Sequence, residues 1–110
     1  MTVKELSQNL NLTVLNDADL SREISSAYAG DLLSWVMGHG EEGNVWITIM
    51  SNNNVIAVAS LLDFSCIILA EGVIPEDDFL TLAKEKCINV LSSKMGIFEL
   101  CAKVYKNIKE

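Results

Sequence analysis

Two short apolar runs constrain the fold of this chain more than any other feature. After Asn44, the run to Met50 contains a single threonine, and Cys66 to Ala70 contains only apolar side chains. Strands that helices cover on both faces have this composition. Joining two parallel strands requires a crossover, which is usually helical. Val55 to Leu62, which lies between the two runs, is therefore predicted to be a helix that starts within Asn52 to Asn54.

The same alternation of strand and helix extends to both sides. Thr2 to Leu10 is predicted to be a helix, because Thr2 and Glu5 have the spacing of a capping box. Asp31 is expected to cap a helix at its N-terminus, and Pro75 to open another at its first position. Short strands are expected at Leu12–Val14, Ile24–Tyr28 and Asn89–Leu91, followed by a last helix that Ser92 or Ser93 caps and whose apolar stripe is Ile97, Leu100, Cys101, Val104, Tyr105 and Ile108.

This order of elements predicts an α/β fold. Residues 1–110 are expected to form one three-layer domain, with a mostly parallel sheet of four to five strands and helices on both faces. The formal net charge of -7 makes nucleic acid and anionic membranes poor partners. Because Met1 to Leu10 lacks a signal-peptide pattern and Val55 to Ala70 is interrupted by polar residues, we expect a cytoplasmic protein without a membrane span.

Residue patterns of catalytic and cofactor sites find little support. Gly38, Gly40 and Gly43 match a dinucleotide-binding spacing, but they follow a helix and precede a strand, which is the reverse of the required order. His39, the single histidine, has no serine or cysteine beside it in sequence to activate. The three cysteines, at 66, 87 and 101, form no Cys-x-x-Cys pair and are interpreted as reduced core thiols. We therefore expect no enzyme activity, no metal and no cofactor.

Candidate ligand-binding residues follow from the predicted sheet. Ligands of parallel sheets bind where the strands end, at their carboxyl ends. Hydroxyls and helix amides there hold anions, and Lys94 would add a compensating charge. The alternative that these polar residues only cap helices stays open. The candidates are Gly30, Asp31, Ser51, Asn53, Gly72, Ser92, Ser93 and Lys94.

Three segments of the chain, 22–27, 30–34 and 44–48, resemble the DRTGG domain family, and the similarity extends from Val3 to about Tyr105. The family pattern Asp-Arg-x-x-Thr-Gly-Gly is followed by a conspicuous Asp-Leu-Leu-Ser. Here Arg22 and the Asp-Leu-Leu-Ser at 31–34 fit the pattern. Serine or alanine replaces its other positions: Ser21 stands for the Asp, Ser25 for the Thr, and Ser26 and Ala27 for the two Gly.

The resemblance implies an α/β module that occurs alone or attached to phosphotransacetylases and CBS-domain pyrophosphatases. It is also similar to the amino-terminal domain of HPr kinase/phosphorylase, whose catalytic P-loop has no counterpart in this sequence. We therefore predict a non-catalytic regulatory or protein-interaction module, a homodimer with a partner enzyme or kinase. The alternative is a nucleotide or phospho-metabolite sensor. The predicted dimer interface is Leu32, Trp35 and Val36, although Trp35 fits an ordinary core position equally well.

Overall fold

The computed structural model describes residues 1–109, one residue short of the predicted domain 1–110. Five strands form one sheet in the order β1-β5-β4-β3-β2, and all neighbours are parallel except β1 and β5. This confirms the predicted mostly parallel sheet. The strands are β1 Thr13–Asn16, β2 Ala27–Ala29, β3 Val45–Thr48, β4 Cys66–Leu69 and β5 Val90–Ser92, and the helices are α1 Val3–Asn9, α2 Leu33–His39, α3 Asn53–Leu61, α4 Phe79–Glu85 and α5 Ile97–Lys109.

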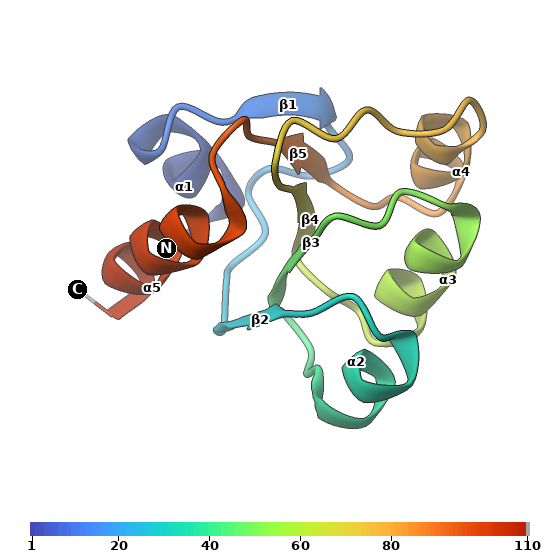
Figure 1. Cartoon of the computed structure of the whole chain (residues 1–110), viewed down its shortest axis with the longest axis horizontal. Coiled ribbons are helices and arrows are strands. Elements are labelled where there is room, and N and C mark those ends of the chain that lie inside the picture. The colour runs from blue at the N-terminus through green and yellow to red at the C-terminus, as the bar shows by residue number, and fades with distance from the viewer. Residues whose placement is uncertain (110) are drawn as a thin grey trace.

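Helices cover both faces of the sheet, as predicted. Helices α2, α3 and α4 lie on one face, and α1 and α5 lie on the other (Figure 1). Within β3, Trp46 packs on the α3 side, whereas Val45 and Ile47 pack on the α5 side. Alternate residues of a strand point to opposite faces, so a strand between two helical layers is apolar throughout. This is the physical reason for the two apolar runs.

The first predicted helix start is confirmed in detail. The Thr2 hydroxyl accepts a hydrogen bond from the Glu5 backbone amide, and the Glu5 carboxylate accepts one from the Thr2 amide. These two bonds form the capping box. At α3 the Asn52 side chain accepts from the Asn54 amide, so this helix also starts where the sequence predicts.

Two other predicted helix starts are wrong. Asp31 does not cap α2, whose N-cap is Leu32 and has no side-chain hydrogen bond. Pro75 does not open α4, which begins four residues later at Phe79. β4 is the central strand of the sheet, whereas α4 packs against α3 and beside β1, so the chain must cover this distance before α4 begins. This tertiary distance overrides the local preference of proline for a helix start.

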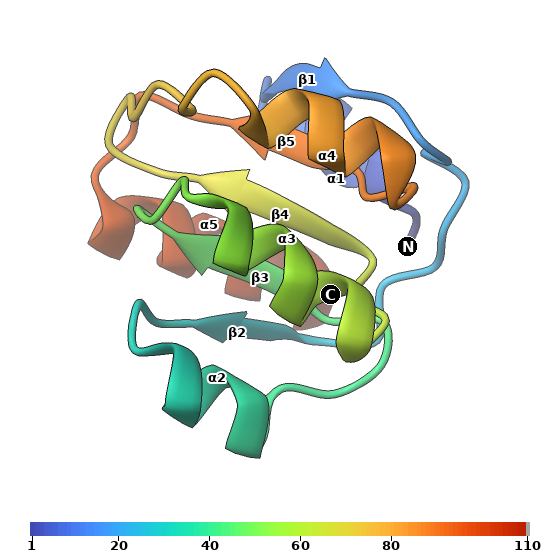
Figure 2. The same cartoon turned by 90° about the vertical axis from the view of Figure 1, so that its right-hand side faces the viewer.

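The connection between β1 and β2 is the longest step across the sheet. These two strands form opposite edges, so residues 17–26 must pass beneath the amino ends of β5, β4 and β3. Figure 2 shows this light-blue segment running down one side of the molecule, away from the arrowheads of the parallel strands.

Among the described residues, no helix combines the length and apolar character that a membrane span needs.

Candidate functional site

The carboxyl edge of the sheet, where the parallel strands β2 to β5 end, contains all of the predicted ligand-binding residues. The structure divides them into two groups rather than one site. Gly72, Ser92, Ser93 and Lys94 line a cleft beside the end of β5. Gly30, Asp31, Ser51 and Asn53 lie near the ends of β2 and β3 and are not part of that cleft.

The cleft beside β5 has a volume of about 530 Å³. Because β1 is antiparallel to β5, residues at the start of β1 reach the edge at which β5 ends. Lys103 of α5 contributes a second ammonium group to the wall, and its Nζ lies 3.5 Å from the Glu99 carboxylate. The cleft is lined by Leu10, Asn11, Thr13, Leu15, Gly72, Val73, Ile74, Pro75, Ser92, Ser93, Lys94, Met95 and Lys103.

The residues of this cleft that the sequence does not predict come from the loops after β4 and β5, from β1 and the turn before it, and from α5. Asn11 and Thr13 are distant from Lys94 in sequence and belong to no motif, and only the antiparallel placement of β1 next to β5 brings them to the cleft. Lys103 lies on α5, the helix that follows β5 directly. The rule that ligands bind in the loops after parallel strands does not include residues that precede an antiparallel strand.

The wall of the cleft is formed by two loops that are tied together. The Gly72 amide donates to the Ser93 carbonyl at 2.9 Å, and the Glu71 amide donates to the Met95 carbonyl at 2.9 Å. Glu71 and Gly72 both have positive φ, 61° and 69°, so the chain turns sharply here. Glycine adopts this conformation without strain, whereas a side chain at position 72 would not.

Glu71 also replaces the predicted cap of α5. The helix begins at Ile97, and the Ile97 amide donates to the Glu71 carboxylate at 2.8 Å. The Ser93 hydroxyl accepts from the Met95 amide instead, within the preceding loop. The first amide of α5 therefore already has an anionic partner. Any anion in the cleft would be held by the lysines and hydroxyls rather than by this helix terminus.

The second group of predicted residues has structural contacts. The Gly30 carbonyl accepts from the Trp46 indole at 2.9 Å. The Asp31 carboxylate accepts from the Thr48 hydroxyl at 2.6 Å and from the Ile49 amide at 3.0 Å, which joins the end of β2 to the end of β3. Asn53 is exposed at the start of α3, and Ser51 is half-buried before it. Nothing in these contacts gathers the four residues around a cavity.

The three predicted interface residues also separate. Leu32 and Trp35 expose 61% and 59% of their surface, so both are available for contact with another molecule. Val36 is fully buried in the core beneath α2, which corrects its prediction as an interface residue. In a helix of two turns, consecutive residues point in different directions, and position 36 is the one that faces the sheet.

Next to Trp35 lies the single histidine. The His39 ring stacks on the Trp35 ring at 4.9 Å between centroids and lies nearly parallel to the Tyr28 ring at 6.2 Å. Its Nδ1 is 2.8 Å from the Trp35 carbonyl oxygen. These contacts orient the ring along α2 and engage one of its two nitrogens.

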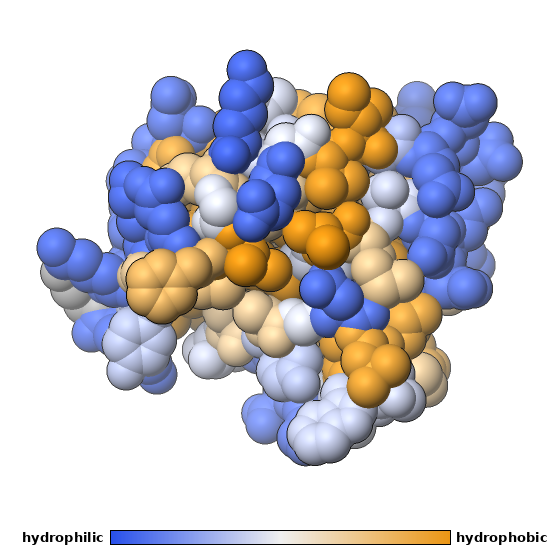
Figure 3. Space-filling view, in the orientation of Figure 1, coloured by the Kyte–Doolittle hydropathy of each residue, from blue (hydrophilic) through white to orange (hydrophobic). Residues whose placement is uncertain are grey.

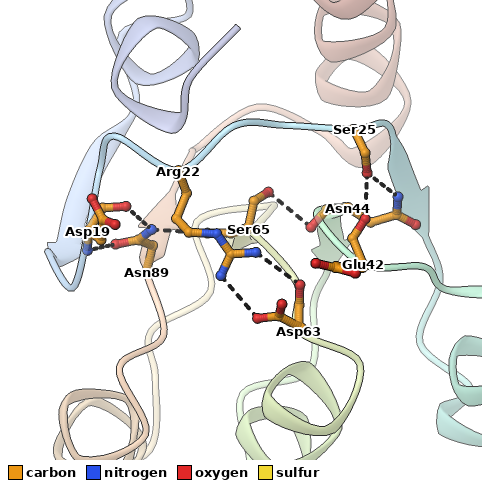
Figure 4. A network of polar contacts seen from close by, with 8 residues as sticks. All are labelled: Asp19, Arg22, Ser25, Glu42, Asn44, Asp63, Ser65 and Asn89. Carbon is orange, nitrogen blue, oxygen red and sulfur yellow. Dashed lines mark hydrogen bonds and ion pairs between the residues drawn. The ribbon is translucent and has the colours of Figure 1, made fainter.

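The amino edge of the sheet contains the motif residues of the resemblance, and they form a network (Figure 4). The Arg22 guanidinium donates to the side chain and to the backbone carbonyl of Asp63, both at 3.1 Å. The Ser25 hydroxyl donates to the Glu42 carbonyl and accepts from the Asn44 side chain. At Gly43, whose φ is 80°, a Cβ would lie 2.9 Å from the Ser25 hydroxyl oxygen. These contacts fasten the crossing segment 17–26 to the loops beneath the sheet.

Buried polar residues that immediately precede β3, β4 and β5 complete the network. Asn89 is 2% exposed, accepts from the amides of Ala18 and Asp19, and donates to the carbonyls of Asp19 and Ser65. The Ser65 hydroxyl donates to the Asn44 carbonyl. Within residues 1–109 every buried side-chain nitrogen and oxygen has a hydrogen-bond partner. The amino edge therefore offers its polar groups to the chain itself.

Cys66 and Cys101 are in surroundings that disfavour the reactive thiolate. Burial raises the pKa of the Cys66 thiol to about 12, and partial burial raises the pKa of Cys101. A thiol that stays protonated is a poor nucleophile and a poor metal ligand. Cys87 is exposed at the end of α4. The part of the chain that the structure describes contains no cluster of three or more His, Cys, Asp or Glu side chains suited to a metal ion.

Comparison with known proteins adds one informative likeness. No family profile and no curated protein match the chain. The fold is similar to that in the crystal structure of the CBS and DRTGG domains of the regulatory region of Clostridium perfringens pyrophosphatase, complexed with the activator diadenosine tetraphosphate, with a TM-score of 0.74 and 16% sequence identity. The superposition covers 94% of this chain and 45% of the other, so this chain spans just under half of its length. In agreement with the sequence resemblance, the chain has a DRTGG-like α/β fold.

Proposed function

We propose that this protein is a non-catalytic regulatory module that senses a small phosphorylated molecule, such as a nucleotide, in the cleft beside β5. The observation that carries the proposal is the meeting of Lys94 and Lys103 at one cleft in a protein of net charge -7. Two ammonium groups raise the local concentration of an anion and hold it by charge-assisted hydrogen bonds. In an acidic protein, such a local positive charge offsets the repulsion between the protein and a negatively charged ligand.

The remaining lining suits the other parts of such a ligand. Hydroxyls of Thr13, Ser92 and Ser93 can donate to phosphate or sugar oxygens, and Ile74 and Pro75 offer apolar surface to a base. The cleft volume of about 530 Å³ lies in the range of small-molecule sites, which is about 300–1,000 Å³. The nucleotide activator in the structure of similar fold supports this choice of ligand class.

The proposal assigns no catalysis to the module. The contacts of the His39 ring are with Trp35 and Tyr28 and include no serine or cysteine for a general base to activate. The Cys66 thiol is held protonated by burial. A cytoplasmic location, with reduced cysteines, is part of the same proposal.

A second part of the proposal is contact with other proteins. Leu32 and Trp35 are large apolar residues that expose more than half of their surface. Large exposed apolar groups of this kind mark interaction surfaces. We propose that the module forms a homodimer and transmits ligand binding to a partner enzyme or kinase.

Thermal unfolding tests the sensing proposal. The protein is heated alone and with ATP, ADP, GTP, diadenosine tetraphosphate or glucose 6-phosphate. A ligand at about 100 times its dissociation constant stabilises the fold by about 2.7 kcal/mol, which corresponds to a rise in Tm of about 10 °C. The variants Lys94→Ala and Lys103→Ala should abolish the rise. Lys106→Ala, on the same helix but outside the cleft, should keep it.

The same experiment can contradict the proposal. If no compound raises Tm at millimolar concentration, the cleft is not a site for these phosphorylated molecules. If a compound raises Tm equally in the Lys94→Ala and Lys103→Ala variants, the ligand binds elsewhere.

A further inference from the structure

The outer strand β2 has one side that pairs with β3 and one side that is free. The Ser26 carbonyl accepts from the first amide of β3 at 2.9 Å, and the Gly30 amide donates to the Ile47 carbonyl at 3.1 Å. Backbone groups of successive residues in a strand point to alternate sides, so Ala27 and Ala29 direct their amides and carbonyls away from β3. β2 contains neither a charged residue nor a proline, which are two common means of protecting an edge strand from further pairing.

A groove with a volume of about 430 Å³ lies between this free edge and α5. The strand side of the groove carries only the small side chains of Ala27 and Ala29. The helix side carries part of the apolar stripe of α5, including Val104, which is fully buried, and Tyr105, which exposes 66% of its surface. In Figure 3 the surface is indented between α5 and α2, the side of the molecule at which β2 lies. The stripe of α5 is therefore wider than the part of the sheet that it covers.

Positive charge is placed at one end of this groove. Helix α5 runs from the carboxyl edge of the sheet to the amino edge (Figure 2), so its last residue, Lys109, lies at the end of the groove where Ser26 precedes β2. The described residues that line the groove include no acidic side chain. The groove is thus mostly apolar and is positive at one end, which is complementary to an apolar segment that carries a carboxylate.

We propose that an extended segment of a partner protein binds the free edge of β2 as an additional, antiparallel strand. The two residues of the segment that lie opposite Ala27 and Ala29 exchange backbone hydrogen bonds with them and direct their own side chains into the groove. These side chains are apolar and larger than alanine. An antiparallel segment ends where β2 begins, so a carboxylate at its C-terminal end lies beside Lys109. The inference goes beyond the proposed function, because it depends neither on the β5 cleft nor on self-association.

A second copy of this chain fits the free edge less well than such a segment. If two β2 strands paired in antiparallel fashion about a twofold axis normal to the sheet, each would direct its own Ala27 and Ala29 to the groove face. Their methyl groups are too small to fill a groove of about 430 Å³, and the groove walls would lose contacts. Valine, isoleucine or leucine side chains fill more of it, which favours a partner segment.

NMR of the isotope-labelled chain, titrated with a synthetic peptide, tests the inference. The probe is acetyl-Ser-Thr-Val-Thr-Ile-Thr-Asp with a free C-terminal carboxylate, in which valine, isoleucine and aspartate share one face. Saturating peptide should slow hydrogen exchange of the Ala27 and Ala29 amides by at least about tenfold, because both groups become hydrogen-bonded.

Two N-methylated peptides of the same sequence separate strand pairing from side-chain contact. Methylation of the valine and isoleucine amides removes the donors that face β2 and should raise the dissociation constant by at least about tenfold. Methylation of the two threonine amides that flank isoleucine alters groups that face away from β2, and should change the dissociation constant by less than about twofold.

Variants of the chain test the groove and its charge. Ala29→Leu fills the groove from the strand side and should raise the dissociation constant by at least about tenfold. Ala29 is exposed, so this variant should keep the native Tm. Lys109→Glu repels the terminal carboxylate and should raise the dissociation constant by about fivefold. Lys86→Glu makes the same charge change at the end of α4, on the other face of the sheet, and should have little effect.

Three results would overturn the inference. The first is that neither the probe nor analogues with two leucines or two phenylalanines in the groove positions protect the Ala27 and Ala29 amides at millimolar concentration. The second is equal binding of the two N-methylated peptides, which would mean that the peptide does not pair with β2. The third is protection of these amides in the free chain that grows with protein concentration, which would assign the edge to a second copy. Ligand sensing is judged separately, since a rise in Tm caused by a nucleotide should be the same in the native chain and in Ala29→Leu.

Discussion

The two edges of the sheet are built in opposite ways. At the amino edge, Asn44, Ser65 and Asn89 precede three neighbouring strands and are almost fully buried. The side chains of Asn44 and Asn89 bind the crossing segment 17–26, and Ser65 links these two residues to each other. At the carboxyl edge, the loops leave a cleft of about 530 Å³ and large exposed apolar side chains. The long connection 17–26 occupies the polar groups at the amino ends of the strands. The connections at the carboxyl ends are shorter and leave surface there for ligands and partners.

The motif residues acquire a meaning from this comparison. Arg22, which fits the DRTGG pattern, and Ser25, which replaces its threonine, belong to the closed amino edge, whereas Asp31 of the Asp-Leu-Leu-Ser segment lies at the carboxyl edge. Their hydrogen bonds go to Asp63, Glu42 and Asn44, all within the chain. In this protein the altered motif therefore fastens the crossing segment, and the candidate ligand site lies at the opposite edge of the sheet.

The largest expected effect is the loss of the central side chain of the amino edge. Asn89→Ala removes four hydrogen bonds and leaves buried backbone groups without partners, which should lower the free energy of unfolding by about 3 kcal/mol. Chemical denaturation measures this loss. Asn53→Ala, which changes an exposed asparagine at the carboxyl edge, is the control. A loss below about 1 kcal/mol for Asn89→Ala would show that the amino edge is not closed by this network.

A second expected effect is a dependence of stability on pH that comes from Cys66, the fully buried first residue of β4. Burial raises the pKa of Cys66 from 9.0 to about 12, so the folded protein keeps this proton where the unfolded chain loses it. Below pH 9 the thiol is protonated in both states, and its full contribution to the free energy of unfolding remains. As the pH rises from 9 toward 12, the unfolded chain loses the proton first, and this contribution is lost. At pH 10 the free energy of unfolding should be about 1.4 kcal/mol lower from this group alone.

Denaturation of the native chain and of Cys66→Ala at pH 7 and pH 10 isolates this contribution. The variant loses some packing at both pH values, but its decrease from pH 7 to pH 10 should be smaller than that of the native chain. Equal decreases in the two proteins would mean that water reaches the thiol.

A smaller effect is expected from the side-chain contact that joins the loop after β4 to the start of α5. Glu71→Ala removes the acceptor of the Ile97 amide and should cost about 1 kcal/mol, as for the loss of a helix cap. Because position 71 has positive φ in both proteins, the backbone strain is unchanged to first order. Glu76→Ala, on the same loop, should cost much less. If the two variants are equally stable, the Glu71 contact does not support the wall of the cleft.

The smallest effects should come from the open edge itself. Ser51→Ala and Lys94→Ala are each expected to change the free energy of unfolding by less than about 0.5 kcal/mol, because neither side chain is buried. Chemical denaturation of the unliganded protein is the measurement. A loss of more than about 1 kcal/mol for Lys94→Ala would assign this lysine a structural role and weaken the comparison between the two edges.

Local patterns determined a large part of the fold. The apolar runs before Met50 and Ala70 predicted two buried strands, and the pair Thr2 and Glu5 predicted a helix start with its two reciprocal bonds. The alternation of these elements predicted three layers and a mostly parallel sheet. All of these depend on residues that are close in sequence, or on the rule that parallel strands need crossovers.

Only the tertiary structure decided how distant residues meet. Asp31 is predicted to cap a helix, but its carboxylate instead accepts a hydrogen bond from the buried Thr48 hydroxyl on the neighbouring strand. Val36 and Trp35 are neighbours in sequence, yet the way α2 packs buries the first and exposes the second. Thr13 reaches the same cleft as Lys94 only because β1 is antiparallel to β5. Composition and spacing specify the elements, whereas burial and contact depend on where each element lies relative to the others.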